Sequence, residues 1–173
     1  MKLTKSKKTL TTSRLLQLAG GPAYSPFRLE ALLSRLNEAG AVPHLASVDA
    51  SFVYFLLTDG ELDAATLEKA CALLSASGAF TADAGFLVTP RLGTISPWSS
   101  KSTDIFHNCG LSQIIRVERG IVYHLRDGEG RALGLDAAAA RLQHLHDRMT
   151  EGVYERADDV FAQYDPAPVK TVD

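Results

Sequence analysis

The hydrophobic and polar positions of this chain alternate between helix-like and strand-like spacing. Between positions 25 and 40 the apolar residues recur at i, i+3, i+4 and i+7, which is the spacing of one helix face. These residues are Leu29, Leu32, Leu33 and Leu36. Ser25 and Pro26 are typical of a helix start and Gly40 of a helix end, so the pattern predicts a helix here.

Strand-like runs flank this helix. The run from Phe52 to Leu57 is apolar throughout, so we expect both faces of that strand to be covered. The strand before it is short, and we expect a tight turn at Asp49-Ala50-Ser51 to join the two. The predicted strands are 14–19, 44–48 and 52–58. A second helix is predicted to place Leu67, Ala70, Cys71 and Leu74 on one side and to end at Gly78.

The same order of elements returns about 70 residues later. The offset between matched residues falls from 71, between Ser25 and Ser96, to 68, between Asp59 and Asp127. The second half has predicted strands at 86–89 and around 117–126, a helix ending near Asn108, and a last helix from Asp136 with Ala138, Leu142, Leu145 and Met149 on its inner face. This pattern predicts an internal duplication of a strand-helix-strand-strand-helix unit, with halves at 13–79 and 85–151.

The fold class predicted from this pattern is α+β. Each half alone is too small to bury much apolar surface, so we expect the halves to share a core or a sheet about a pseudo-twofold axis. The duplicated domain spans 13–155, after a flexible arm at 1–12 and before an extended, proline-containing linker at 156–173.

Composition narrows the classes of partner. Apolar residues make up 46% of the 173 residues and charged residues 22%, which are ordinary globular values. The net charge of −2 argues against a nucleic-acid binder, and no apolar run is long enough to cross a membrane. Cys71 and Cys109 have no paired spacing, which predicts reduced thiols in a cytoplasmic protein.

Candidate chemistry gathers in the segment 89–110, at the start of a predicted helix. Five hydroxyl side chains and Lys101 surround this start, where free backbone N–H groups attract anions and hydroxyls cap them. The segment is therefore either a well-capped turn or a docking site for a polar or anionic group. Trp98 is likewise either an interface anchor or a core residue, as Phe27 would be in the first half.

The sequence offers only weak catalytic and metal-binding patterns. Cys109 follows His107 by two residues, a spacing that alone does not indicate a nucleophile and its base. His144 and His146 would diverge on a helix, so we do not expect them to share a metal ion. The sequence therefore predicts neither a catalytic group nor a metal site in this chain.

The segment also carries a family resemblance. It reads Pro90-Arg91-Leu92-Gly93-Thr94-Ile95-Ser96-Pro97-Trp98-Ser99-Ser100-Lys101-Ser102-Thr103-Asp104-Ile105-Phe106-His107-Asn108-Cys109-Gly110. This run resembles the N-terminal region of the large, single-chain phosphoribosylformylglycinamidine synthases of purine biosynthesis, and departs from it at Leu92, where the family has Pro. Weaker similarity extends to 117–120 and 145–149.

The resemblance implies a fold like a fused dimer of PurS-type subunits, with antiparallel sheets covered by helices. It also implies that the parent enzyme is a ligase using ATP, magnesium and glutamine-derived ammonia, whose cofactors and catalytic groups belong to domains outside this chain. No cofactor is expected here. The implied partners are the synthetase and glutaminase domains of the parent, which this module would brace and couple for ammonia transfer.

The predicted contact surface consists of Arg91, Thr94, Ser96, Trp98, Ser99, Ser100, Lys101, Asp104, His107 and Asn108. In this hypothesis Arg91 and Lys101 meet carboxylates or phosphate, Trp98 anchors the contact and the hydroxyls meet backbone groups. The alternative is a free-standing α+β module that senses a small anion or nucleotide at the seam between its halves.

Overall fold

The computed structural model describes residues 13–38, 42–81 and 85–156. The predicted arm at 1–12 and the predicted linker beyond residue 156 lie outside the described residues. The elements are β1 (Ser13–Pro22), α1 (Pro26–Glu38), β2 (Leu45–Asp59), α2 (Ala64–Leu74), β3 (Gly78–Ala79), β4 (Phe86–Pro90), α3 (Pro97–Asn108), β5 (Ile114–Asp127), α4 (Leu135–Ala138), the 3-10 helix η1 (Ala139–His144) and β6 (Glu151–Tyr154).

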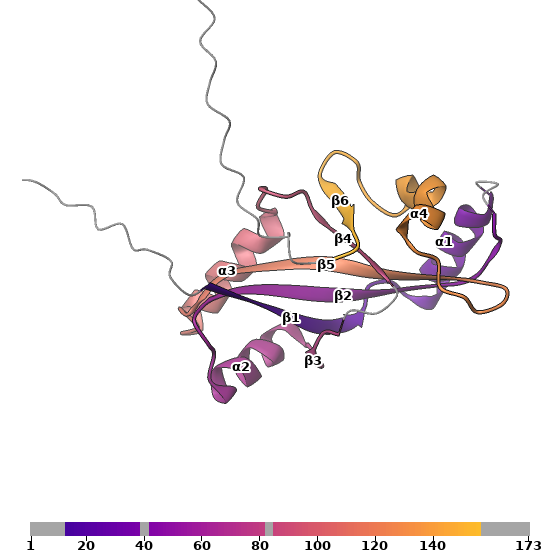
Figure 1. The fold of residues 1–173 in the computed structure, drawn as a ribbon. Helices are drawn as coiled ribbons and strands as arrows, with labels where there is room; N and C mark the ends of the chain where they lie inside the picture. The colour runs from indigo at the N-terminus through magenta and orange to yellow at the C-terminus, as the bar shows by residue number, and fades with distance from the viewer. Residues whose placement is uncertain (1–12, 39–41, 82–84, 157–173) are drawn as a thin grey trace, which may run out of the picture.

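The described strands form one antiparallel sheet in the order β3-β1-β2-β5-β4-β6, which confirms the α+β class (Figure 1). The long strands β2 and β5 pair at its centre, where Val48 faces Leu125 and Leu56 faces Val117. Reading outward from this pair, the strand order is β2, β1, β3 on one side and β5, β4, β6 on the other. This arrangement is what a duplication would produce, and the duplication itself stays a prediction.

The predicted turn at residues 49–51 is wrong, because β2 runs unbroken from Leu45 to Asp59. Asp49 and Ser51 pair with His124 and Val122 of β5, so the ladder continues through the expected break. Ala50 between them is buried in the core. The polar residues thus alternate with an inward-facing alanine, which is the period of a strand with two different faces.

Two helix ends differ from prediction. Helix α2 stops at Leu74, before the predicted Gly78, because Ser75 takes the left-handed conformation at φ 52°. The predicted last helix breaks into α4 and η1, and the chain turns at Asp147, whose side chain accepts the Met149 N–H at 2.8 Å. Met149 is therefore exposed and not on an inner helix face.

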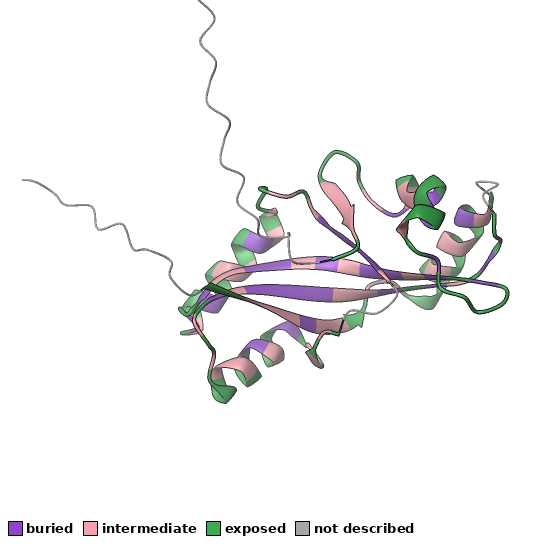
Figure 2. Ribbon diagram, viewed as in Figure 1, coloured by how far each residue is buried: buried purple, intermediate pink, exposed green. Residues whose placement is uncertain are grey.

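The helices cover one face of the sheet. The alternate β2 residues Val48 and Ala50 belong to one hydrophobic cluster, together with Leu36 of α1 and Ala138 of α4. Tyr54 and Leu56, on the same face of β2, belong to a second cluster that includes residues of α2 and α3. The two helix pairs therefore lie near opposite ends of the sheet, as Figure 1 shows, with the buried centres of β2 and β5 between them in Figure 2.

The opposite face of the sheet is closely packed at Gly120. A Cβ atom at this position would lie 2.7 Å from Thr89 Cγ2 and 2.9 Å from the Val88 carbonyl oxygen. We therefore expect Gly120→Ala to lower the free energy of unfolding by about 1 to 3 kcal/mol in urea denaturation. Gly128→Ala, where a Cβ atom meets open space, is the control and should stay within about 0.5 kcal/mol. Equal effects of the two changes would contradict the overpacking argument.

Candidate docking surface

Helix α3 takes the place of a missing strand neighbour along β5. Strand β4 pairs with β5 only between Ile121 and Tyr123, so no described strand covers that side of β5 before Ile121. The Ser99 hydroxyl donates to the Val117 carbonyl at 2.5 Å, and the Val117 N–H donates to Thr103 Oγ1 at 3.0 Å. Ser99 and Thr103 lie one helical turn apart, so together they satisfy both backbone groups of one residue at a sheet edge.

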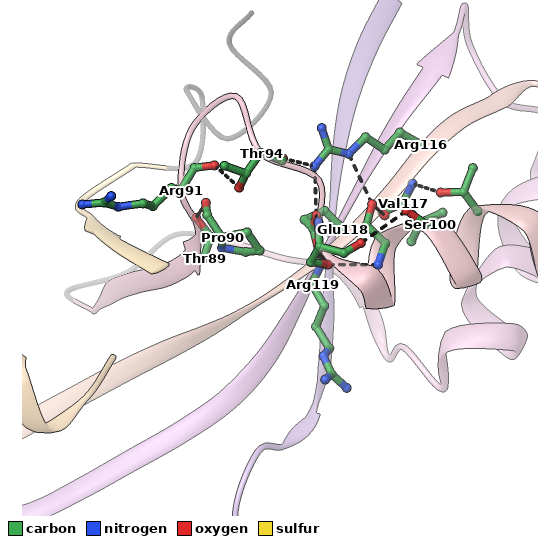
Figure 3. A network of polar contacts seen from close by, with 12 residues as sticks. Thr89, Pro90, Arg91, Thr94, Ser100, Arg116, Val117, Glu118 and Arg119 are labelled. Atoms are coloured by element: carbon green, nitrogen blue, oxygen red, sulfur yellow. Dashed lines mark hydrogen bonds and ion pairs between the residues drawn. The ribbon is translucent and has the colours of Figure 1, made fainter. Parts of the chain in front are cut away.

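A buried carboxylate anchors the start of α3. Ser96 caps the helix by accepting the Ser99 N–H at 2.9 Å, and its hydroxyl donates to Glu118 Oε1 at 2.7 Å. Glu118 is only 1% exposed and pairs with the Arg116 guanidinium at 2.9 Å. It also accepts the Arg119 N–H at 3.1 Å. Figure 3 shows Glu118 at the centre of this network, with the Arg119 side chain directed away from it.

The same network holds the loop between β4 and α3. The Arg116 guanidinium donates to the Thr94 carbonyl at 2.7 Å, and the Thr94 hydroxyl donates to the Arg91 carbonyl at 2.6 Å. The Arg91 side chain points away from these bonds (Figure 3). The loop is therefore fixed from the inside by its backbone and leaves a cation on its outer side.

Trp98 lies against the sheet of its own domain and is half-buried. Its ring stacks on Tyr54 at a centroid separation of 6.0 Å, and the Arg119 guanidinium lies 4.8 Å from its centroid. The expected likeness to Phe27 is wrong, because Phe27 is 78% exposed and fills no core. The aromatic residue that packs inward thus belongs to the second half, where we expected the outward-facing one.

The other predicted contact residues divide into anchored and free groups. Ser96, Ser99 and Thr94 bond within the domain, and His107 Nε2 lies 2.7 Å from the Ile114 carbonyl. Ser100 is exposed, with a long 3.5 Å bond to the Ser96 carbonyl. The side chains of Arg91, Lys101, Asp104 and Asn108 are exposed and have no hydrogen bond or ion pair with another described residue. Ser99 is fully buried, so it does not belong to the surface.

Sequence reasoning missed the apolar part of this surface. A hollow of about 380 Å³ lies between the loop and the segment before β6, and Ile95 and Met149 line it. Ile95 is 62% exposed and Met149 82% exposed. An isoleucine within a polar loop was the available signal for the first, whereas the expected longer helix concealed the second. Exposed apolar residues around a hollow are typical of a binding surface.

Both sides of the hollow are fixed in place. The Arg91 N–H donates to the Thr150 carbonyl at 3.0 Å, which ties the loop to the segment 147–151. Within that segment the Asp147 N–H donates to Glu151 Oε2 at 2.8 Å. The Asp147 carboxylate accepts the Met149 N–H, and this bond is the main cause that lowers the pKa of Asp147 below its usual value. Met149 is thus presented by an ordered turn.

The described residues contain no group of three His, Cys, Asp or Glu side chains placed to hold a metal ion. None of the helices in the described part of the chain is both long and apolar enough to span a bilayer. Cys71 and Cys109 are half-buried free thiols.

One comparison with known families gives a match. The family model described as formylglycinamide ribonucleotide amidotransferase N-terminal matches residues 51–164, which is 114 of the 173 residues. The matched range contains the loop between β4 and α3, the buried Glu118 and the exposed Met149.

Proposed function

This chain belongs to the family of formylglycinamide ribonucleotide amidotransferase N-terminal domains, and we propose that it is a docking module of such an enzyme and carries no catalytic group. Membership gives it a role in phosphoribosylformylglycinamidine synthase and hence in purine biosynthesis. In the proposal, the module braces the synthetase and glutaminase domains of the parent chain in the cytoplasm and so helps ammonia to pass between them.

The surface around Ile95 and Met149 carries the proposal. These exposed apolar side chains border one hollow, and the backbone bond from Arg91 to Thr150 holds its two sides together. An apolar centre with a polar rim is the usual composition of a specific interface. A surface whose backbone is already ordered loses little conformational entropy on binding, which favours docking without rearrangement.

The charged groups near this centre indicate what the partner would present. Arg91 and Lys101 are exposed cations without ion pairs among the described residues, so they would meet carboxylates or phosphate of the partner domain. Ser96 and Ser99 already bond within the module, so Ser100 is the serine that would meet partner backbone. ATP, magnesium and the glutamine nucleophile would belong to the partner domains and would act there.

Reconstitution tests the proposal. The remainder of the parent protein, produced without residues 1–173, would be mixed with this chain and assayed with glutamine and, separately, with free ammonia. The proposal expects ammonia-driven turnover in the remainder alone and glutamine-driven turnover only after the chain is added. Full glutamine-driven activity without the chain would overturn it. Binding without rescue of either reaction would place the module's role in building the synthetase site.

Ile95→Ser should weaken association with the remainder by about tenfold or more, because fully burying an isoleucine side chain is worth about 1.5 to 3 kcal/mol and about 1.4 kcal/mol is tenfold. Stability should change by less than about 0.5 kcal/mol, since the side chain is largely exposed in the isolated module. Calorimetric titration of the remainder with the variant measures the loss. The matched control is Val42→Ser, an exposed apolar residue outside this surface. An equal loss for both variants would contradict a defined docking site.

A further inference from the structure

A second hollow, of about 250 Å³, lies beside α1 where that helix meets β5 and η1. Its walls come from both halves of the chain and include Tyr24, Phe27, Arg28 and Arg35 from the first half and Tyr123 and His144 from the second. The volume lies below the roughly 300 to 1,000 Å³ of pockets for drug-sized ligands. A ligand buried here would therefore be small.

The charge of this hollow is positive. Arg28 and Arg35 lie seven residues apart on α1, which is two helical turns, so both are on the side that lines the hollow. Neither arginine has an ion pair or hydrogen bond with another described residue. No carboxylate is among the residues that line the hollow. Two guanidinium groups facing one concavity favour an anion with several acceptor oxygens.

Two hydrogen-bonded phenols join the two halves at the wall of the hollow. The Tyr24 and Tyr123 hydroxyl oxygens lie 2.9 Å apart, and the Tyr123 hydroxyl donates to the Leu145 carbonyl at 3.3 Å. Burial, helped by the bond to Tyr24, raises the pKa of Tyr123 well above its usual value, so this phenol stays protonated. Because the single Tyr123 proton goes to the Leu145 carbonyl, Tyr24 donates to Tyr123 and is not a donor to the hollow.

The rim of the hollow is aromatic. Phe27 is 78% exposed and is among the residues that line the hollow. Its ring lies beside the hollow that Arg28 also lines. A flat ligand ring could lie against the Phe27 face while a charged group of the same ligand enters the hollow.

We infer that this hollow binds a small phosphate monoester whose ester group carries a flat ring. Arg28, Arg35 and His144 hold the phosphate, and Phe27 contacts the ring. Phosphate suits this set better than a carboxylate, because three donor groups face three terminal oxygens instead of two. The site is separate from the docking surface, so either inference can fail without the other.

Isothermal titration calorimetry of the 173-residue chain with phenyl phosphate, inorganic phosphate and phenol tests the inference. Phenyl phosphate should bind saturably, inorganic phosphate more weakly, and phenol without measurable heat. Binding of phenol as tight as that of phenyl phosphate, or no saturation by phenyl phosphate at about 10 mM, where even a 1 mM site would be largely filled, would overturn the inference.

Variants distinguish a site from general attraction of anions. Arg35→Gln and Arg28→Gln should each weaken phenyl phosphate binding by about tenfold, the loss expected for one charge-assisted bond. Arg148→Gln makes the same charge change at an exposed residue outside the hollow and should have little effect. An equal loss in all three variants would show non-specific attraction and overturn the site.

Phe27→Ala tests the contact with the ring. This change should remove the preference for phenyl phosphate over inorganic phosphate, and a retained preference would exclude ring stacking.

Discussion

Replacing Glu118 with alanine is expected to lower the free energy of unfolding by about 3 to 5 kcal/mol, the range for breaking a buried ion pair from one side. The change leaves the Arg116 guanidinium, whose side chain is only 19% exposed, without its carboxylate. It also removes the acceptor of the Ser96 hydroxyl and the Arg119 N–H. Urea denaturation measures the loss, as a lower midpoint at an unchanged slope.

Two further variants show which parts of the Glu118 network stabilise the fold. Glu118→Gln keeps the size and one acceptor oxygen but not the charge, so its loss should be smaller than that of Glu118→Ala. Ser96→Ala removes the cap of α3 and one bond to Glu118, for an expected loss of about 1 to 2 kcal/mol. A Glu118→Ala protein as stable as the unmodified chain would show that the network does not hold the loop.

The Glu118 variant also links the interior to the docking surface. Arg116 and Glu118 together fix the loop that carries Ile95, although neither residue is part of that surface. Loss of the network should therefore weaken glutamine-driven turnover in the reconstituted enzyme more than Ile95→Ser does. Ammonia-driven turnover, which needs no transfer between domains in the proposed function, should change less.

Periodicity predicted the element order well where each element has one apolar face. The leucines of α1 and the start of α3 at Ser96-Pro97 gave these helices nearly their observed bounds. The errors arose where two signals compete. Asp49 and Ser51 resembled a turn, yet pairing with β5 along the whole of β2 satisfies their backbone groups. Long-range pairing of this kind leaves no local signature in the sequence.

The candidate site was harder to predict for a related reason. The cluster of serines predicted an exposed polar surface, but Ser99 and Thr103 instead bond to the backbone of β5 at its edge. That edge is open to them only because β4 pairs with a short part of β5. Glu118 lies between Val117 and Arg119 in β5, and its burial with Arg116 follows from the placement of α3. Composition locates such residues in a segment, whereas the partners of each hydroxyl depend on tertiary packing.

A second large loss of stability is expected from Arg141→Met, at the other end of the sheet. Arg141 is fully buried, and its guanidinium donates to the Leu36 carbonyl at 3.3 Å and to the Pro43 carbonyl at 2.6 Å. Methionine fills much of the volume but leaves both carbonyls without this donor. At about 1 to 3 kcal/mol for each of the two unsatisfied carbonyls, the expected loss is about 2 to 6 kcal/mol. Arg148→Met, at an exposed position, is the control and should be nearly neutral.

The sign of the Arg141 result decides between two physical accounts. If the bonds to the carbonyls outweigh the cost of burying the charge, Arg141→Met is destabilising, whereas a dominant desolvation cost would make it stabilising.

Hydrogen exchange shows which part of the fold is destabilised by Arg141→Met. The amides of α1 should lose protection, because α1 contributes Leu36 to the hydrophobic cluster beside Arg141, while the amides of α3 should keep it. Glu118→Ala should show the reverse pattern. Since the two residues serve separate clusters, the losses should add in the double variant, and a clear departure from additivity would mean that the two ends of the sheet are coupled.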